Sequence, residues 1–137
     1  MGYAGTSHKN CKGIIKSVAN RALIHHLSTE NPNASLIMSG EDLCNQGPVV
    51  VMQDLCVAAA LGIESVERNG HHYCAGLSDH PASVQETMLQ HHGDVYQSSP
   101  HGWPTLNIRD GQISMKTINQ APFGIQIIPE TGDYGQS

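Results

Sequence analysis

The feature that most constrains this chain is the alternation of short apolar runs with longer segments that resemble helices. Strands are predicted at residues 3–8, 35–38 and 63–67, and helices at 12–28, 48–61 and 81–92. This order, repeated three times, predicts an α/β fold in which right-handed βαβ units build a parallel sheet. Ligands of such sheets bind outside the carboxyl ends of the strands. Polar residues that follow the three strands are therefore the first candidates for a functional site.

Residues with special backbone preferences mark the ends of the predicted helices. Asn31-Pro32-Asn33 ends the first helix. Pro48 stands in the first turn of the second, where its missing N–H costs little, and Gly62 is a natural C-terminal cap. Pro81 opens the third helix.

The tail of the chain has a different character. Residues 105–108 and 113–116 flank Arg109-Asp110-Gly111-Gln112, and Asp-Gly between two such runs predicts a β-hairpin, because both turn positions need a positive φ. Trp103 and Phe123 are predicted to be packing residues.

Composition restricts the class of protein. The 137 residues are enough for one domain with a hydrophobic core. A net charge of −5, with 7 Lys and Arg in total, gives no basic surface for a nucleic acid. No apolar run approaches the roughly 20 residues that cross a bilayer, so we expect a soluble, cytoplasmic protein that binds no membrane. The four cysteines form no C-x-x-C pair and are predicted to be reduced thiols.

The first polar cluster follows the first strand, from Thr6 to Gly13. His8 or Lys9 could serve as a general base or as a cation for a carboxylate. Lys12 would lie near a helix N-terminus, which is unfavourable for a cation unless an anion binds there. The alternative is a solvated turn in which Ser7 or Asn10 caps the helix.

The second cluster is Ser39-Gly40-Glu41-Asp42, directly after the second strand. Two adjacent acids there could hold a magnesium ion, orient a base or bind substrate hydroxyls. Acids favoured at a helix N-terminus by the helix dipole are an equally good interpretation.

The third cluster follows the third strand and contains Asn69, His71 and His72 as candidate substrate-binding residues. Neighbouring histidines point in different directions, so we expect only one of the two to face a site, and a plain polar loop is the alternative. A zinc site using His8, Cys11, His72 and Cys74 is a further hypothesis, although the spacing matches no familiar zinc motif.

The order of these segments resembles the C-terminal region of the enolase superfamily, in its mandelate racemase and muconate lactonising branch. The first cluster resembles the end of the sixth strand of the family's (β/α)₈ barrel, 38–43 resembles the seventh unit, and 67–73 resembles the eighth. The tail at 106–111 and 121–125 resembles the family's closing segment. The resemblance implies that residues 1–100 are the last βα units of a barrel and that 101–137 are a C-terminal hairpin and closing tail.

The resemblance also implies a chemistry. The family abstracts a proton α to a carboxylate, stabilises the enediolate on magnesium, and then racemises, cycloisomerises or dehydrates. By position, His8, Lys9 and Glu41 are the implied catalytic residues. The implied substrate-binding residues are Ser39, Asp42, Asn69, His71 and His72. The substrate would be a small carboxylate such as an acid sugar, and the intact enzyme could be a homo-oligomer.

The sequence departs from the family pattern in two respects. A plain Lys followed by a Gly-Gly turn is replaced by His8-Lys9-Asn10, and Glu41 stands where the racemases have a histidine. The magnesium ligands are expected outside this chain, on earlier strands, because a full barrel takes about 250 residues. We therefore expect a C-terminal portion that is inactive by itself. The principal alternative is a self-contained α/β module that binds a small anion.

Overall fold

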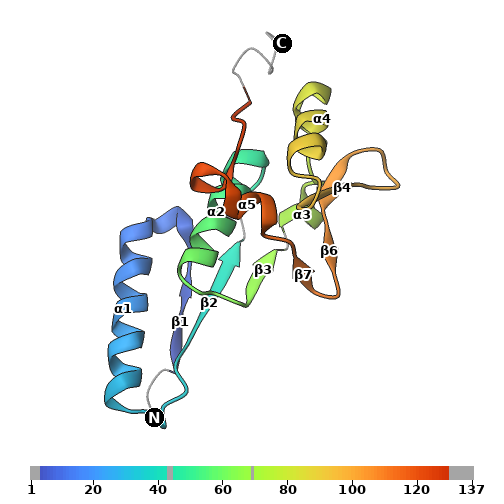
Figure 1. The fold of residues 1–137 in the computed structure, drawn as a ribbon. Coiled ribbons are helices and arrows are strands. Elements are labelled where there is room, and N and C mark those ends of the chain that lie inside the picture. Colours follow the sequence, from blue (N-terminus) through green and yellow to red (C-terminus); the bar gives the residue numbers. More distant parts are fainter. Residues whose placement is uncertain (1–3, 43–44, 69, 130–137) are drawn as a thin grey trace. The chain divides into compact units, whose positions relative to one another are not determined.

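The computed structural model describes residues 4–42, 45–68 and 70–129 and has a mixed α/β fold (Figure 1). The chain divides into two compact units. The sheet unit comprises residues 1–43 and 57–68, and the hairpin unit comprises 44–56 and 69–137. Helix α2 (Pro48–Ala60) gives its first nine residues to the hairpin unit and its last four to the sheet unit.

The sheet unit is built on three parallel strands in the order β1-β2-β3, which are Gly5–His8, Ile37–Asp42 and Val66–Arg68. Helix α1 (Ile14–Glu30) connects β1 to β2, after a short 3₁₀ turn at Asn10–Lys12. The predicted parallel sheet is confirmed.

Strand β2 is longer than its apolar run. The sequence predicts a strand at 35–38, whereas β2 continues to Asp42 and pairs Glu41 with Glu67 and Asp42 with Arg68. Backbone hydrogen bonds to β3 extend the strand, so residues expected in a polar turn lie within the sheet. Strand β3 correspondingly begins at Val66, later than the predicted start at 63.

The two faces of this sheet differ. On one face, Met38 packs in a core with Ile24 of α1 and with Val57 and Ala58 of α2. Side chains alternate across a strand, so the neighbours of Met38 belong to the opposite face. There Ile37 is 63% exposed, and Ser39 is half-buried. Helices thus cover one face, and the other is open and mainly polar.

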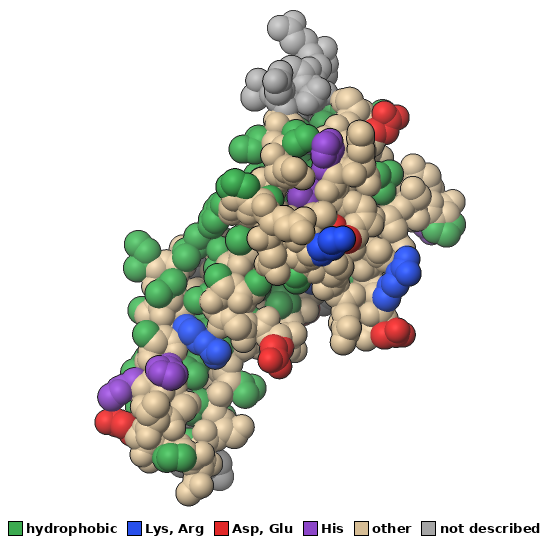
Figure 2. All heavy atoms as spheres, in the orientation of Figure 1, with side chains coloured by type: hydrophobic (Ala, Val, Ile, Leu, Met, Phe, Trp, Pro, Cys, Tyr) green, Lys and Arg blue, Asp and Glu red, His purple; other side chains and the backbone are tan. Residues whose placement is uncertain are grey.

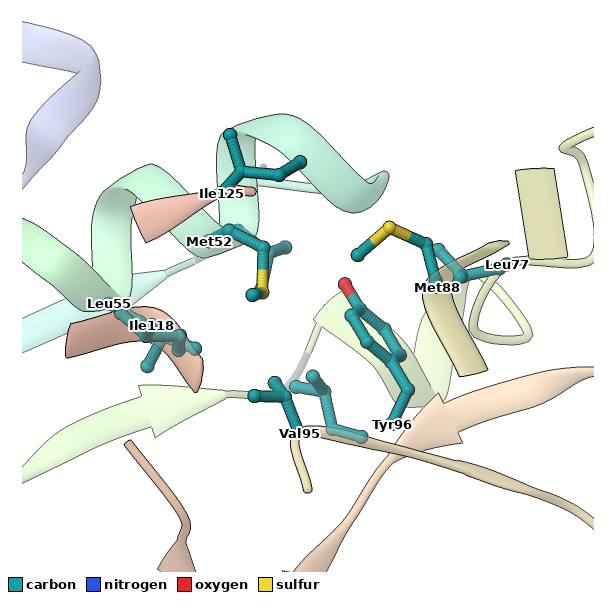
Figure 3. Packing of buried hydrophobic residues seen from close by; sticks show 10 residues of the cluster. Met52, Leu55, Leu77, Met88, Val95, Tyr96, Ile118 and Ile125 are labelled. Atoms are coloured by element: carbon teal, nitrogen blue, oxygen red, sulfur yellow. The ribbon is translucent and has the colours of Figure 1, made fainter. Parts of the chain in front are cut away.

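The hairpin unit contains the remaining elements, all of them short. Its helices are α3 (Gly70–Tyr73), α4 (Ala82–His91) and α5 (Lys116–Gln120), followed by a 3₁₀ turn at Pro122–Gly124. Its strands are β4 (Tyr96–Ser98), β5 (Pro104–Leu106), β6 (Ile108–Arg109) and β7 (Gln112–Ile113). In Figure 3 the side chains of Met52, Met88 and Tyr96 point into a common core.

The hairpin predicted around Asp110-Gly111 is confirmed. Strands β6 and β7 pair antiparallel, and Asp110 and Gly111 have φ values of 51° and 75°. The prediction that residues 105 and 106 belong to this hairpin is wrong, because β5 pairs with β4 instead. The β4–β5 hairpin was not predicted, because each of its strands is only three residues long, although Pro100 and Gly102 in the connecting loop are typical turn residues.

Within the described residues the strands form three separate small sheets and no closed barrel. In the same part of the chain, no helix has both the length and the apolar character that a membrane span requires.

Candidate functional site

The ends of β1, β2 and β3 bring polar residues together at one edge of the sheet. His8 lies opposite Gly40, Glu41 opposite Glu67, and Asp42 opposite Arg68. The first two predicted clusters therefore meet in space, as the parallel order requires. Arg68 also lies at this edge and is 6% exposed. It was not among the predicted site residues, although it follows the third predicted strand directly and lies within the segment 67–73 that resembles the eighth unit.

Lys9 and Glu41 form an ion pair across this edge. Their side chains are 34% and 35% exposed. Lys9 has an extended backbone, with φ −139° and ψ 110°, so the alternation of β1 continues through it. Lys9 therefore belongs to the face of Ser7, and Glu41 to the face of Ser39, which is the face that the helices leave open.

His8 lies on the other face of the sheet. It is 3% exposed, and its Nδ1 is 2.6 Å from Oγ of Ser17 on α1. Sequence reasoning left open whether His8 or Lys9 faces a site. The structure brings Lys9 to Glu41 and directs His8 toward the helix.

A small polar cleft of about 140 Å³ adjoins Lys9 at the start of α1. It is lined by Thr6, Ser7, Lys9, Gly13, Lys16, Ser17 and Asn20. Gly13 occupies the N-cap position of α1, and neither Ser7 nor Asn10 caps the helix as the turn interpretation expected. The first turn of α1 holds no acidic residue. Lys16 and the N-terminus of α1 give this cleft a positive potential, to which Lys9 adds although it is paired with Glu41.

The other predicted residues are described only in part. Ser39 is half-buried on the open face. The backbone of Asp42 ends β2, and the backbones of His71 and His72 lie in helix α3, where a polar loop was one interpretation. The side chains of Asp42, His71 and His72 lie outside the part of the chain that the structure describes, as does the whole of Asn69.

The described residues do not provide a metal site. Among them, no three His, Cys, Asp or Glu side chains lie close enough together to hold an ion. Glu41 pairs with Lys9, and His8 contacts Ser17. This part of the chain therefore does not fit a magnesium or zinc centre by itself.

A second polar network lies in the hairpin unit, around the fully buried His92. Nδ1 of His92 is 2.9 Å from Oγ1 of Thr117, and Nε2 accepts the backbone N–H of Gln126 at 3.3 Å. The Asp94 carboxylate accepts hydrogen bonds from the hydroxyls of Thr117 at 2.5 Å and Ser114 at 2.8 Å. It also accepts the backbone N–H of Thr117, so Asp94 caps α5 from outside that helix.

Two residues of this network, His92 and Asp94, have pKa values below their ordinary ones. Burial lowers the pKa of His92, and the nearby Asp94 carboxylate opposes this only in part. Burial raises the pKa of Asp94, but the hydrogen bonds from Thr117 and Ser114 more than compensate, so it falls below its ordinary value. This arrangement suits a structural role, holding α4, α5 and the following segment together.

Comparison of the chain with protein-family models, with curated proteins and with solved structures found no match.

Proposed function

We propose that this chain is the C-terminal part of an α/β barrel enzyme of the enolase-superfamily type, which abstracts a proton α to a carboxylate. The reaction would be an acid-sugar dehydration, a racemisation or a cycloisomerisation. The observation that carries the proposal is the Lys9–Glu41 pair, located at the carboxyl ends of parallel strands and on the sheet face that helices leave open.

The geometry of the sheet unit supports the proposal that its three strands form part of the wall of a barrel. Its strands follow one another in chain order, and α1 and α2 cover the same face. In a (β/α)₈ barrel the helices form the outer ring, and the opposite strand faces fill the interior. Ser7, Ser39, Glu41 and Glu67 would then point inward, with Lys9 and Glu41 at the catalytic end.

Exposed apolar residues on α1 support the proposal that this helix packs against further βα units in the intact enzyme. Ile15 is 87% exposed, Val18 52% and Leu23 54%. Figure 2 shows hydrophobic side chains at the surface along this helix. Among the described residues, β1 and β3 each pair with a strand on one side only. Further βα units on both sides would cover these edges and this helix.

In this proposal Lys9 exchanges the proton with the α-carbon, and Glu41 orients its amine. A lysine acts as a base only when it is neutral, and a carboxylate beside it favours the charged form. His8 would position the strand end through Ser17.

Magnesium would supply stabilisation of the enediolate in such enzymes. The described residues of this chain do not fit that ion. The proposal therefore assigns no step of this chain's chemistry to it.

The decisive experiment begins with the DNA upstream of the codon for Met1. The proposal expects an open frame that encodes further strands with acidic residues at their ends. The polypeptide so encoded should exchange the α-proton of an acid sugar in D₂O, followed by NMR. Lys9→Met should reduce the exchange rate at least 100-fold, the lower end of what a general base contributes.

Lys116→Met is the matched control, because Lys116 is exposed on α5 in the hairpin unit. It should leave the exchange rate unchanged. Exchange that survives Lys9→Met, or a complete polypeptide that exchanges no α-proton of any carboxylate tested, would refute the proposal.

The polar cleft beside Lys9 favours a second candidate, a self-contained module that binds a small anion. Two lysines and the start of α1 are groups that bind phosphate or a carboxylate. The isolated 137-residue chain should then unfold cooperatively and be stabilised by phosphate, and Lys16→Met should remove that stabilisation.

A further inference from the structure

A groove of about 640 Å³ lies beside the β4–β5 hairpin, in the hairpin unit. It is lined by Ala75, Gln97, Ser99, His101, Trp103, Thr105, Leu106 and Ile108. Its volume falls in the range of small-molecule sites, roughly 300–1,000 Å³. None of these residues belongs to the sheet-edge site described above.

The aromatic wall of this groove is held in place by its loop. The rings of His101 and Trp103 stack with centroids 5.4 Å apart and planes inclined by 20°. The backbone N–H of Ser99 donates to the carbonyl of Trp103, and that of Gly102 donates to the carbonyl of Ser99. Gly102 has a φ of 94°, which favours glycine. The loop is thus closed by its own hydrogen bonds, and the two rings are presented in a fixed arrangement.

Polar side chains stand beside the aromatic pair. Gln97 and Thr105 are direct partners in the β4–β5 ladder, so their side chains share one face. Ser99 follows two residues after Gln97. An amide and two hydroxyl groups can each donate and accept hydrogen bonds.

The charge of the lining is equally informative. None of the eight described residues that line the groove is Asp, Glu, Lys or Arg. A phosphate or a carboxylate would find no lysine or arginine among these residues, and a ligand cation would find no carboxylate. The groove therefore suits a neutral ligand that has both an apolar surface and many hydroxyl groups.

We propose that this groove binds a neutral saccharide. The C–H face of a sugar ring packs against the Trp103–His101 pair, while its hydroxyls bond to Gln97, Ser99 and Thr105. A nucleotide fits less well, since its phosphates would remain without partners. The inference does not depend on the proposed enzymatic function, because the two sets of residues are distinct.

Trp103 is the only tryptophan of the chain, so its fluorescence reports directly on the groove. The full chain is titrated with cellobiose, maltose and xylobiose, with galacturonate as an anionic probe and adenosine as a flat aromatic probe. At least one neutral disaccharide should change the fluorescence with saturation. Galacturonate and adenosine should bind at least tenfold more weakly.

Two variants keep the reporter and test the contacts. Gln97→Ala and Thr105→Val should each weaken the binding of the sugar about five- to tenfold. Their matched controls are Gln90→Ala and Thr87→Val on α4, which lie outside the lining and should leave the affinity unchanged. The proposal is overturned if no neutral sugar gives a saturable change, if Gln97→Ala and Thr105→Val bind like the original chain, or if galacturonate or adenosine binds best.

Discussion

His92 is fully buried, and each of its two ring nitrogens has a hydrogen-bond partner. The Thr117 hydroxyl donates its one hydrogen to Asp94, so toward His92 its oxygen must accept a hydrogen bond from the Nδ1–H group. This leaves Nε2 as the acceptor for the backbone N–H of Gln126. The network therefore selects the neutral Nδ1–H tautomer of His92, and both ring nitrogens are satisfied.

The neutral state of His92 predicts a dependence of stability on pH. In the folded chain, burial lowers the pKa of His92 below its ordinary value of 6.5. Below pH 6.5, the unfolded chain therefore binds a proton at this residue that the folded chain does not bind. The contribution of neutral His92 to the free energy of unfolding should be fully present above pH 6.5. It should be lost progressively as the pH falls from 6.5 toward the pKa of the folded chain. A single such group gives a limiting slope of about 1.4 kcal/mol per pH unit.

Urea unfolding between pH 5 and pH 8 measures this slope. His92→Gln should reduce it, leaving the contribution of His80, whose pKa burial also lowers. His25→Gln, which replaces a histidine on the exposed surface of α1, is the matched control. Direct NMR titration of His92 with a midpoint above 6.5 would contradict the prediction.

A second prediction concerns the hydroxyl of Thr117. Thr117→Val keeps the shape of the side chain but removes the group that links His92 to Asp94. The buried Nδ1–H of His92 then loses its acceptor, and we expect the free energy of unfolding to fall by about 1–3 kcal/mol. Thr87→Val removes a hydroxyl that donates only to Ser83 of its own helix, and should cost less than about 0.5 kcal/mol. Equal losses in denaturant unfolding would show that the network contributes nothing.

Among the elements, the segment after α5 lies against α2 through a glycine. Gly124 has a φ of 86° and is buried. A Cβ at this position would contact the carbonyl oxygen of Met52 and lie 2.8 Å from Cβ of Cys56. The close approach of this segment to α2 therefore requires a residue without a side chain.

Gly124→Ala tests that approach. The positive φ alone costs an alanine about 1–2 kcal/mol, and the collision with the backbone of α2 adds roughly 1–3 kcal/mol. Gly111→Ala is the matched control, because Gly111 has a φ of 75° and open space around its Cβ position. In thermal unfolding, the Gly124 variant should lose clearly more stability than the Gly111 variant. Equal losses would mean that the contact with α2 does not matter.

At the scale of the whole molecule, the open edges of the sheet unit and the apolar surface of α1 predict how the isolated chain behaves. Among the described residues, β1 and β3 each have one edge without a partner strand. These edges and the exposed Ile15, Val18 and Leu23 are sites of association. The 137-residue chain by itself should therefore form concentration-dependent oligomers.

Analytical ultracentrifugation of an Ile15→Lys variant checks this expectation. The charge on α1 should shift the distribution toward monomer. Tyr73→Lys adds the same charge at a side chain that is 85% exposed on α3, and should have little effect. A chain that is monomeric at all concentrations would contradict the prediction and favour a self-contained module.

Local signals determined a large part of this structure. The three strand–helix repeats and the Asp110-Gly111 hairpin follow from periodicity and from backbone preferences that act over a few residues. The neighbourhood of Glu41 and the first cluster also follows, because parallel strands end at one edge. The short helix α3, the 3₁₀ turns and the β4–β5 hairpin carry no comparable local pattern, and the sequence did not predict them.

Only the tertiary structure decided which side chains act together. Adjacent residues of a strand point to opposite faces, and the packing of α1 placed His8 inward against Ser17 and left Lys9 to pair with Glu41. Pairing with β3 carried β2 through the acidic residues. His92 became a buried centre because Thr117 and Gln126, distant in the chain, supply its partners. Such contacts join residues far apart in the sequence, so periodicity and turn preferences, which act locally, do not specify them.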